Sequence, residues 1–284
     1  MREDTSGSIA AVTGASRGIG RAVAWELARR GYHVFALARS RADLDQLADE
    51  ATAAGYHVEH VTMDVADDES RARAVASIFD ATGGYGVDVL VNNAGYGQFG
   101  PLEEVSIEKF RRQLEVNLVG VLGFTQPFLP NMRERRRGRI INISSAAGRV
   151  ATPFMGAYNA SKFGLEGMSD ALRNELSPFG VHVVLIAPGP IDTQFGNVAN
   201  AETEKRPASP YTPYLKGWRR TRGRSDRFGR SAETVARVVA RAVEAEHPRP
   251  RYTITITAKL GAVARRLVPD TVTDWVLRRA MGGG

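Results

Sequence analysis

A tyrosine and a lysine stand four residues apart within AYNASKFGLEG, residues 157–167. If this segment is a helix, Tyr158 and Lys162 project from the same face, one turn apart. A phenol ordinarily has a pKa of about 10, and a neighbouring ammonium lowers that pKa because it favours the phenolate. Such a phenol could pass a proton to a carbonyl oxygen or take one from an alcohol. At this composition a Tyr with a Lys four positions later arises by chance with a probability of about 0.14, so the pair is a hypothesis that the rest of the chain must support.

Short β-rich runs alternate along the chain with longer amphipathic segments. The expected strands are 8–13, 33–38, 57–62, 87–92, 139–144, 181–187 and 252–257. The expected helical segments lie near 18–30, 41–54, 69–82, 107–134, 157–177 and 231–246. Most of the strands are continuous apolar runs, which is typical of strands covered on both faces. The alternation predicts one α/β domain over residues 1–284, a Rossmann-type doubly wound fold with seven parallel strands flanked by helices.

A glycine-rich stretch, TGASRGIG at 13–20, follows the first expected strand and opens the first expected helix. Gly14, Gly18 and Gly20 permit a sharp turn whose backbone approaches a pyrophosphate, and the helix N-terminus faces the negative charge. A glycine-rich turn alone is a weak signal, but its position between strand and helix predicts a dinucleotide-binding turn. The spacing is GxxxGxG rather than the more common GxGxxG.

Two arginines indicate which dinucleotide this turn would hold. Enzymes that use NAD place a carboxylate at the end of the second strand, where it accepts the ribose 2′-hydroxyl. Here that strand ends with Ala38 and Arg39, and Arg17 precedes Gly18 within the turn. Two guanidiniums could hold a ribose 2′-phosphate in bidentate fashion, which predicts NADP(H). The alternative is two solvated arginines in an arginine-rich chain.

These motifs together resemble the short-chain dehydrogenase/reductase family, whose glycine motif is TGxxxGxG. The resemblance extends to about residue 257 and implies four catalytic residues, Asn117, Ser145, Tyr158 and Lys162. Ser145 stands thirteen residues before Tyr158, as the family's catalytic serine does, and would hold the substrate oxygen and stabilise developing charge. Asn117 would hold a water that links Lys162 to solvent. The alternative for Asn117 is a core asparagine whose hydrogen bonds are satisfied.

Three further stretches match the family: MDV after the third strand, NNAG after the fourth and PGPIDT after the sixth. All lie at carboxyl ends of strands, where an open α/β sheet binds its ligands. The glycine turn and the resemblance together imply cofactor contacts from Gly14, Ser16, Arg17, Gly18, Ile19, Gly20, Arg39, Asp64, Val65, Asn92, Ala94, Tyr158, Lys162, Pro188, Gly189, Ile191 and Thr193. Ser145 and Tyr158 would also contact the substrate.

Composition and charge argue against several other kinds of site. The chain has no cysteine, which excludes disulfides and thiolate metal ligands. Its five histidines lack ligand spacing, so we expect no metal. The net charge is +7, but the arginine cluster RERRRGR at 133–139 lacks interleaved aromatics and suits an exposed helix end, so we expect no nucleic-acid partner. No signal peptide or bilayer-spanning run is visible, which predicts a cytoplasmic protein.

Two segments bear on the substrate. Residues 193–230 are rich in Pro, Gly, Arg and aromatics without clear periodicity, which is typical of a substrate lid over an apolar slot. Residues 258–284 carry an apolar stripe at helical spacing and predict a C-terminal helical extension. Many members of the family, including 3-oxoacyl carrier-protein reductases, end soon after the seventh strand. The extension here resembles the hydroxysteroid- and retinol-dehydrogenase-like branch, whose members act on lipophilic alcohols, aldehydes and ketones.

The sequence therefore predicts an NADP(H)-dependent oxidoreductase that acts on CH–OH groups and interconverts a lipophilic ketone or aldehyde with its alcohol. Carbonyl reduction is the expected direction, because cells keep NADPH reduced. The alternatives are a 3-oxoacyl thioester reductase and a non-catalytic NADP-sensing protein. The resemblance also implies a homodimer or homotetramer. The basic amphipathic tail could cover the protein's own core, a subunit contact or a membrane surface.

Overall fold

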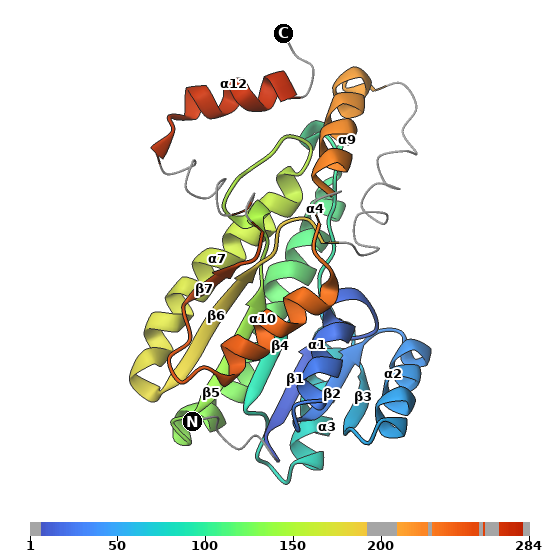
Figure 1. Ribbon diagram of the computed structural model, residues 1–284, viewed down its shortest axis with the longest axis vertical. Helices are drawn as coiled ribbons and strands as arrows, with labels where there is room; N and C mark the ends of the chain where they lie inside the picture. Colours follow the sequence, from blue (N-terminus) through green and yellow to red (C-terminus); the bar gives the residue numbers. More distant parts are fainter. Residues whose placement is uncertain (1–6, 192–208, 227–228, 256–257, 259–266, 281–284) are drawn as a thin grey trace.

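Seven strands form one sheet in the computed structural model, which describes residues 7–191, 209–226, 229–255, 258 and 267–280 (Figure 1). The strand order is β3-β2-β1-β4-β5-β6-β7, and every neighbouring pair is parallel. The strands are β1 Ile9–Thr13, β2 His33–Ala38, β3 Val58–Thr62, β4 Val89–Asn92, β5 Gly138–Ile143, β6 Val181–Ala187 and β7 Arg251–Thr253. The strand order reverses between β1 and β4, which creates a crevice at their carboxyl ends. The predicted doubly wound parallel sheet is confirmed.

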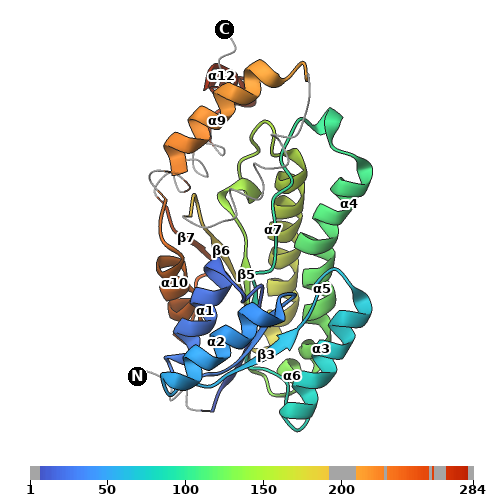
Figure 2. The same ribbon diagram turned by 90° about the vertical axis from the view of Figure 1, so that its right-hand side faces the viewer.

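Helices cover both faces of this sheet, so the fold has three layers (Figure 2). The layer over one face holds α1, α2 and α10, and the layer over the other holds α3 to α7. The α-helices are α1 Gly18–Ala28, α2 Arg41–Ala53, α3 Asp68–Ala81, α4 Ile107–Leu114, α5 Gly120–Thr125, α6 Leu129–Glu134, α7 Gly156–Leu176, α9 Thr212–Asp226, α10 Ala232–Glu244 and α12 Asp270–Ala280. Helix α2 is capped by Ser40, whose hydroxyl accepts a hydrogen bond from the Asp43 N–H at 3.4 Å.

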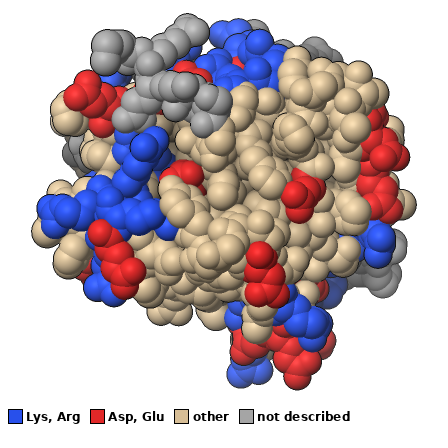
Figure 3. Space-filling view, turned by 90° about the horizontal axis from the view of Figure 1, so that it is seen from below, with Lys and Arg blue, Asp and Glu red and all other residues tan. Residues whose placement is uncertain are grey.

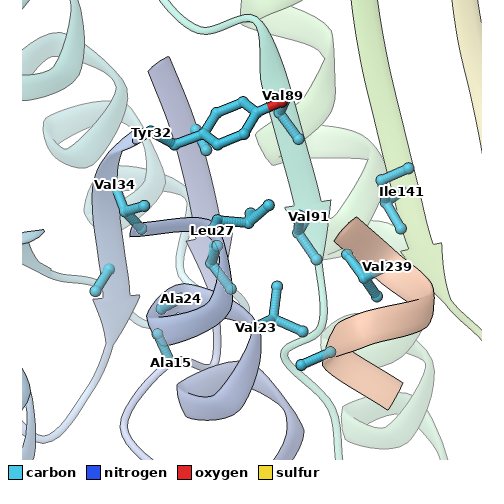
Figure 4. Packing of buried hydrophobic residues seen from close by; sticks show 14 of the residues in the cluster. Ala15, Val23, Ala24, Leu27, Tyr32, Val34, Val89, Val91, Ile141 and Val239 are labelled. Carbon is cyan, nitrogen blue, oxygen red and sulfur yellow. The ribbon is translucent and has the colours of Figure 1, made fainter. Parts of the chain in front are cut away.

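The side chains of each central strand alternate between two buried clusters, one on each face. On β1, Ala10 and Val12 belong to the cluster under α1 and α10, whereas Ala11 belongs to the cluster under α3 and α7. Figure 4 shows the first cluster, in which Val23 and Leu27 of α1 point at the strands. Because neither face meets water, both sets of side chains are apolar, and the strands are continuous apolar runs rather than alternating ones.

The segment 107–134, expected as one long helical pattern, is broken into several pieces. After α4 comes a π-helical turn, Glu115–Val119, and α5 and α6 are separated by the 3₁₀ turn Gln126–Phe128. Pro127 and Pro130 each lack the N–H that a continuous α-helix would use, so the tighter turn falls where the prolines lie. The expected element exists, but its hydrogen-bonding pattern changes four times along its length.

The end of the chain differs in part from the sequence prediction. The last strand covers only Arg251–Thr253 rather than 252–257, and residues 256–257 lie outside the described ranges. Within the expected lid, 193–230, the structure describes α9 and its flanks. Within the expected extension, 258–284, it describes α12, which contacts α9 at the top of the molecule in Figure 1.

The arginine cluster at 133–139 is used by the protein's own fold. Arg135 donates to the carbonyls of Tyr85 and Val87 and lies over the Tyr85 ring. Arg139 donates to the carbonyls of Val243 and Ala245 at 3.2 and 2.9 Å. On the face seen in Figure 3, basic side chains stand in separate groups with acidic side chains beside them. These contacts agree with the interpretation of the cluster as a helix end entering the next strand.

The described ranges contain neither a helix suited to crossing a membrane nor a side-chain cluster suited to a metal ion. Among the helices of these ranges, none combines the length and apolar character needed to cross a bilayer. In the same part of the chain, no group of three or more His, Asp or Glu side chains is placed to hold a metal ion.

A buried polar network joins the centre of the sheet to the helices on one face. The Asn92 amide at the end of β4 donates to Thr125 Oγ1 of α5 at 3.0 Å and to Asn142 Oδ1 of β5 at 2.8 Å. The Asn142 amide in turn donates to Ser169 Oγ of α7 at 2.8 Å. These side chains are at most 3 % exposed, so each hydrogen bond replaces one that water can no longer make. The network fixes α5 and α7 to the two strands that end beneath the crevice.

This network predicts the effect of Asn92→Ala. The substitution leaves Asn142 Oδ1 buried without a partner and removes one of the two hydrogen bonds of Thr125 Oγ1, which keeps its bond to the Val121 carbonyl, so we expect the free energy of unfolding to fall by about 2–3 kcal/mol. Urea denaturation followed by circular dichroism measures the loss. Gln46→Ala is the control, since it removes only an exposed hydrogen bond to Glu50 and should change stability by less than about 0.5 kcal/mol. Equal losses in the two variants would contradict the structural role of Asn92.

Candidate active site

A cleft of about 1900 Å³ opens at the carboxyl ends of the central strands. The predicted site residues that line it are Gly14, Ser16, Arg17, Gly18, Ile19, Arg39, Asp64, Val65, Ala94, Ser145, Tyr158, Lys162, Pro188, Gly189 and Ile191. Gly20, Asn92 and Asn117 are not among the lining residues, and Thr193 lies outside the described residues. The cleft therefore gathers residues that follow β1, β2, β3, β4, β5 and β6 with residues of α7.

The glycine turn between β1 and α1 is held against the loop after β4. Gly14 has a φ of +67°, and a Cβ there would lie 2.9 Å from the Ala94 Cα, so no other residue fits without displacing that loop. A Cβ on Gly20 would lie 2.2 Å from the Gly14 carbonyl oxygen, so only glycine fits at this position. Gly20 thus packs against the glycine turn from behind the cleft wall. The Asn93 amide donates to the carbonyls of Thr13 and Gly14 at 2.9 and 3.2 Å. The sequence prediction did not assign this role to Asn93, although Asn93 belongs to the NNAG motif that could have indicated it.

Cationic side chains surround the part of the cleft next to β2 and β3. Arg17 and Arg39 are exposed on its wall, and Arg112 contacts Asp64 with 2.9 Å between Nη2 and Oδ2. Partial burial by itself would raise the pKa of Asp64. Hydrogen bonds from the Ala66 N–H and from Arg112, with the charges of Arg112 and Arg39, outweigh burial and hold that pKa below its ordinary value. This end of the cleft is suited to an anionic ligand group.

Tyr158 and Ser145 form the hydrogen-bonded pair at the other end of the cleft. Ser145 begins the turn after β5, and its hydroxyl accepts a hydrogen bond from the Ala147 N–H at 3.1 Å. Tyr158, on α7, is 5 % exposed and hydrogen-bonded to Ser145. Burial raises the pKa of Tyr158 above its ordinary value, and the Ser145 hydrogen bond and the charge of Arg222 act in the opposite direction.

Lys162 lies one helical turn beyond Tyr158 and is almost entirely buried. Its Nζ donates to the Ile143 carbonyl at the end of β5 at 2.8 Å and lies 5.9 Å from the centre of the Tyr158 ring. Burial lowers the pKa of Lys162 to about 8, against the opposing charge of Glu166. The expectation that Lys162 makes the Tyr158 phenol more acidic is not met in this structure. Burial dominates the pKa of Tyr158, and the main influences that oppose it are the Ser145 hydrogen bond and the charge of Arg222.

Asn117 lies in the π-helical turn between α4 and α5 and is fully buried. Its Oδ1 accepts from the Tyr96 N–H at 3.1 Å, and its amide donates to the Tyr96 carbonyl at 3.0 Å and to Ser161 Oγ at 3.1 Å. The side chain therefore fastens the loop after β4 to α7, directly beside Lys162 in the chain. A π turn within an α-helix frequently marks a functional site.

Aromatic side chains form the wall facing Tyr158. Phe99 packs edge-on against both Tyr158 and Trp218, with ring centres 5.9 and 5.8 Å apart. Phe154 packs edge-on against Trp218 and Tyr211. Phe154 has a φ of +64°, a conformation that costs a non-glycine residue about 1–2 kcal/mol and that holds its ring in this wall. The wall joins three segments distant in the sequence, including α9 of the expected lid.

Arg222 of α9 is a cleft residue that sequence reasoning did not single out. Its guanidinium lies over the rings of Phe99 and Trp218, 4.3 and 5.4 Å from their centres. Its charge acts on Tyr158, which belongs to the same aromatic cluster. Nothing in the sequence distinguishes Arg222 from the other arginines of α9, because only the packing of α9 on Phe99 brings it to the site.

Sequence comparisons give relatives that match nearly the whole chain. A family model described as short chain dehydrogenase matches residues 8–204. An uncharacterized oxidoreductase, YbbO of Escherichia coli strain K12, is 36% identical over 270 residues, which are 94% of this chain and 93% of the relative. An NADPH-dependent 3-dehydrocapnine reductase of Ornithobacterium rhinotracheale is 33% identical over 269 residues, 93% of this chain and 94% of the relative.

Solved structures of similar fold include both kinds of dinucleotide complex. An actinorhodin polyketide ketoreductase variant with NADPH is 31% identical and covers 92% of this chain and 99% of its own, with a TM-score of 0.76. A short chain dehydrogenase/reductase from Burkholderia phymatum in complex with NAD is 28% identical and covers 93% of this chain and 94% of its own, with a TM-score of 0.81. Overall likeness thus accompanies either dinucleotide, so the side chains beside β2 must distinguish them.

The packing around Lys162 predicts opposite effects for two glycine substitutions. A Cβ on Gly148 would lie 2.9 Å from the Lys162 carbonyl and 3.0 Å from Ser144 Oγ, so Gly148→Ala should cost about 1–3 kcal/mol through overpacking. Gly167 on α7 has no atom within 4 Å of such a Cβ, so Gly167→Ala should stabilise the helix by about 0.5–1 kcal/mol. Thermal unfolding measures both. A melting temperature that rises for Gly148→Ala would contradict the packing described here.

Proposed function

The chain belongs to the short-chain dehydrogenase family, and we propose that it is an NADP(H)-dependent oxidoreductase that interconverts a lipophilic ketone or aldehyde with its alcohol. One observation carries the proposal. Tyr158 is a buried phenol, hydrogen-bonded to Ser145, on the wall of a cleft whose far end has a glycine turn and three arginines. A proton donor and a dinucleotide cradle thus share one cavity.

The protonation of Tyr158 favours carbonyl reduction. Because burial raises its pKa, the phenol keeps its proton at neutral pH and can give it to a carbonyl oxygen that becomes an alkoxide. Ser145 would share the hydrogen bond to that oxygen, and the charges of Lys162 and Arg222 would stabilise the phenolate that remains. When bound, NADPH supplies the hydride. Asn117 would act as a positioning residue, since it fastens Tyr96 and α7 rather than contacting the cleft.

The chain's own residues fit an NADP(H) cofactor. The positive φ of Gly14 and the lack of a Cβ there leave the backbone free to approach a pyrophosphate at the N-terminus of α1. Arg17 and Arg39 would hold the ribose 2′-phosphate, and Asp64 with Val65 would hold the adenine. Ile191 would stand at the nicotinamide end. The relative described as NADPH-dependent and the ketoreductase structure with NADPH support this choice of dinucleotide.

A lipophilic substrate is supported by the wall that faces Tyr158. Phe99 and Trp218 line the cleft near Tyr158 together with Met155 and Val150, and Phe154 packs behind Trp218. A cytoplasmic location, a homodimer or homotetramer and a single catalytic domain remain predictions from the sequence. So does the alternative of a 3-oxoacyl thioester as substrate.

The proposal is tested by NADPH oxidation over a panel of ketones, aldehydes and 3-oxoacyl thioesters of increasing chain length. We expect turnover with the ketones or aldehydes, rising with apolar chain length. Tyr158→Phe removes the proton donor and should lower kcat by about 10²- to 10⁴-fold while NADPH still binds. Tyr56→Phe is the matched control, because Tyr56 does not line the cleft and lies on the other side of Trp25 from it. Undiminished turnover in Tyr158→Phe would exclude the proposed acid, and turnover with thioesters alone would favour the alternative substrate.

The choice of dinucleotide is tested with Arg39→Asp. A carboxylate in this position repels a 2′-phosphate and can accept a 2′-hydroxyl, so the ratio of NADPH to NADH affinity should fall by about 10- to 100-fold. Fluorescence titration with each dinucleotide measures the ratio without any substrate. Arg41→Asp is the control, since Arg41 is 73% exposed, pairs with Asp45 and does not line the cleft. An unchanged ratio in Arg39→Asp would contradict the role given to Arg39.

A further inference from the structure

Four ionisable side chains follow one another along α7 at intervals of four residues: Tyr158, Lys162, Glu166 and Asp170. Each therefore lies one helical turn from the next. The first three are between 5 and 7 % exposed, and Asp170 is partly exposed. The proposed mechanism uses the first two. Glu166 is a buried carboxylate with no part in it.

Arg251 of β7 holds this carboxylate in place. Its Nε donates to Glu166 Oε2 at 2.7 Å, and its Nη2 donates to both oxygens of Asp170 at 2.7 and 2.8 Å. Glu166 Oε1 is buried and has no hydrogen-bond partner among the described residues. Arg251 thus divides its charge between two carboxylates, and one oxygen of Glu166 stays uncompensated.

Lys162 lies one helical turn before Glu166 on α7, and both side chains are buried. From β5 and the turn after it, Lys162 meets the Ile143 carbonyl and the segment with Ser144 and Gly148. A Cβ on Gly148 would lie 2.9 Å from the Lys162 carbonyl and 3.1 Å from Glu166 Cγ, so the two residues share this contact.

The remaining groups near Lys162 come from other elements. The π turn contributes the neutral Asn117, α9 contributes Arg222 beside Tyr158, and β7 contributes Arg251 beyond Glu166. Within the described ranges no carboxylate reaches ion-pair distance of Lys162. Glu166 is the nearest group whose charge favours the ammonium, and it acts through space across one helical turn.

We propose that Glu166 is a positioning residue for the reaction: its carboxylate, fixed by Arg251, keeps the buried ammonium of Lys162 charged beside Tyr158. Burial opposes the charged form of a lysine, and a nearby carboxylate offsets that cost. Without Glu166, Lys162 would lose its proton at a lower pH, and the phenolate left by Tyr158 would lose one of the two cations that stabilise it, with Arg222 remaining. This inference rests on the proposed function for its catalytic consequence, but the charge of Lys162 can be measured without any substrate.

The test is the titration of Lys162 in Glu166→Gln. The chain has five lysines, so the Cε resonance of Lys162 can be followed by NMR in protein labelled with ¹³C-lysine and assigned by its loss in Lys162→Met. In the unaltered protein we expect a pKa of about 8. Glu166→Gln, which keeps the size of the side chain and an oxygen for Arg251, should lower this pKa by about half to one unit. A general loosening of the fold would do the opposite, since exposure to water raises the pKa of a buried lysine.

Asp170→Asn is the matched control. It removes a carboxylate bound to the same arginine but two turns from Lys162, so the Lys162 titration should stay where it is. If Glu166→Gln does not fold, Glu166→Gln/Arg251→Gln removes the guanidinium together with the carboxylate that it pairs with, and it should shift the titration in the same direction by about half as much. A Lys162 pKa that is unchanged or raised in both Glu166 variants would overturn the proposal.

The catalytic consequence is read from the pH profile. The charged form of Lys162 exists below its pKa, so activity should fall as pH rises through that value. Glu166→Gln should move this alkaline limb to lower pH by the shift seen in the NMR titration, and Asp170→Asn should not move it. If kcat of Glu166→Gln falls equally at every pH while the alkaline limb of its profile stays in place, Glu166 has a structural role only. That result would overturn the inference. Absence of turnover in the unaltered protein would instead refute the proposed function, and the titration would still decide whether Glu166 governs the charge of Lys162.

Discussion

Burial of a lysine ammonium at the end of a central strand is the constraint on which the rest of the site depends. An ammonium removed from water costs several kcal/mol unless polar groups surround it. Here the Ile143 carbonyl lies 2.8 Å from Lys162 Nζ, because α7 packs directly on β5 and β6. The turn after β5 can approach α7 this closely only because Gly148 has no side chain. The same packing brings Ser145 to Tyr158.

Asparagine side chains within the cleft wall and behind it hold this arrangement in place. Each amide can donate and accept at once, so one side chain can join two backbone segments. Asn93 joins the glycine turn to the loop after β4, and Asn117 joins that loop to α7. Asn92 joins β4 to β5 and α5. The residues that line the cleft are thus held in position by hydrogen bonds from asparagine amides.

The sequence was sufficient for features that depend on local pattern. Continuous apolar runs predicted the parallel strands, and the four-residue spacing of Tyr158 and Lys162 placed both on one helix face. It was insufficient where burial and distant packing decide. The pKa of Tyr158 follows from burial against Phe99, which no spacing reveals. Arg222 reaches the cleft only through the packing of α9, and Asn117 was assigned through the family resemblance, whereas its hydrogen bonds to Tyr96 and Ser161 are seen only in the fold.

Because of the π turn at Glu115–Val119, the orientation of Asn117 depends on the number of residues in this helical segment rather than on their types. A π turn holds one residue more than the α-helical turn it replaces. Deleting any single residue between α4 and Asn117 would convert it to ordinary helix and rotate the amide by about 100° around the axis. Asn117 would remain in the sequence, but its hydrogen bonds to Tyr96 and Ser161 would be lost. Between homologous chains, an alignment gap here would therefore signal a lost function more reliably than a substitution.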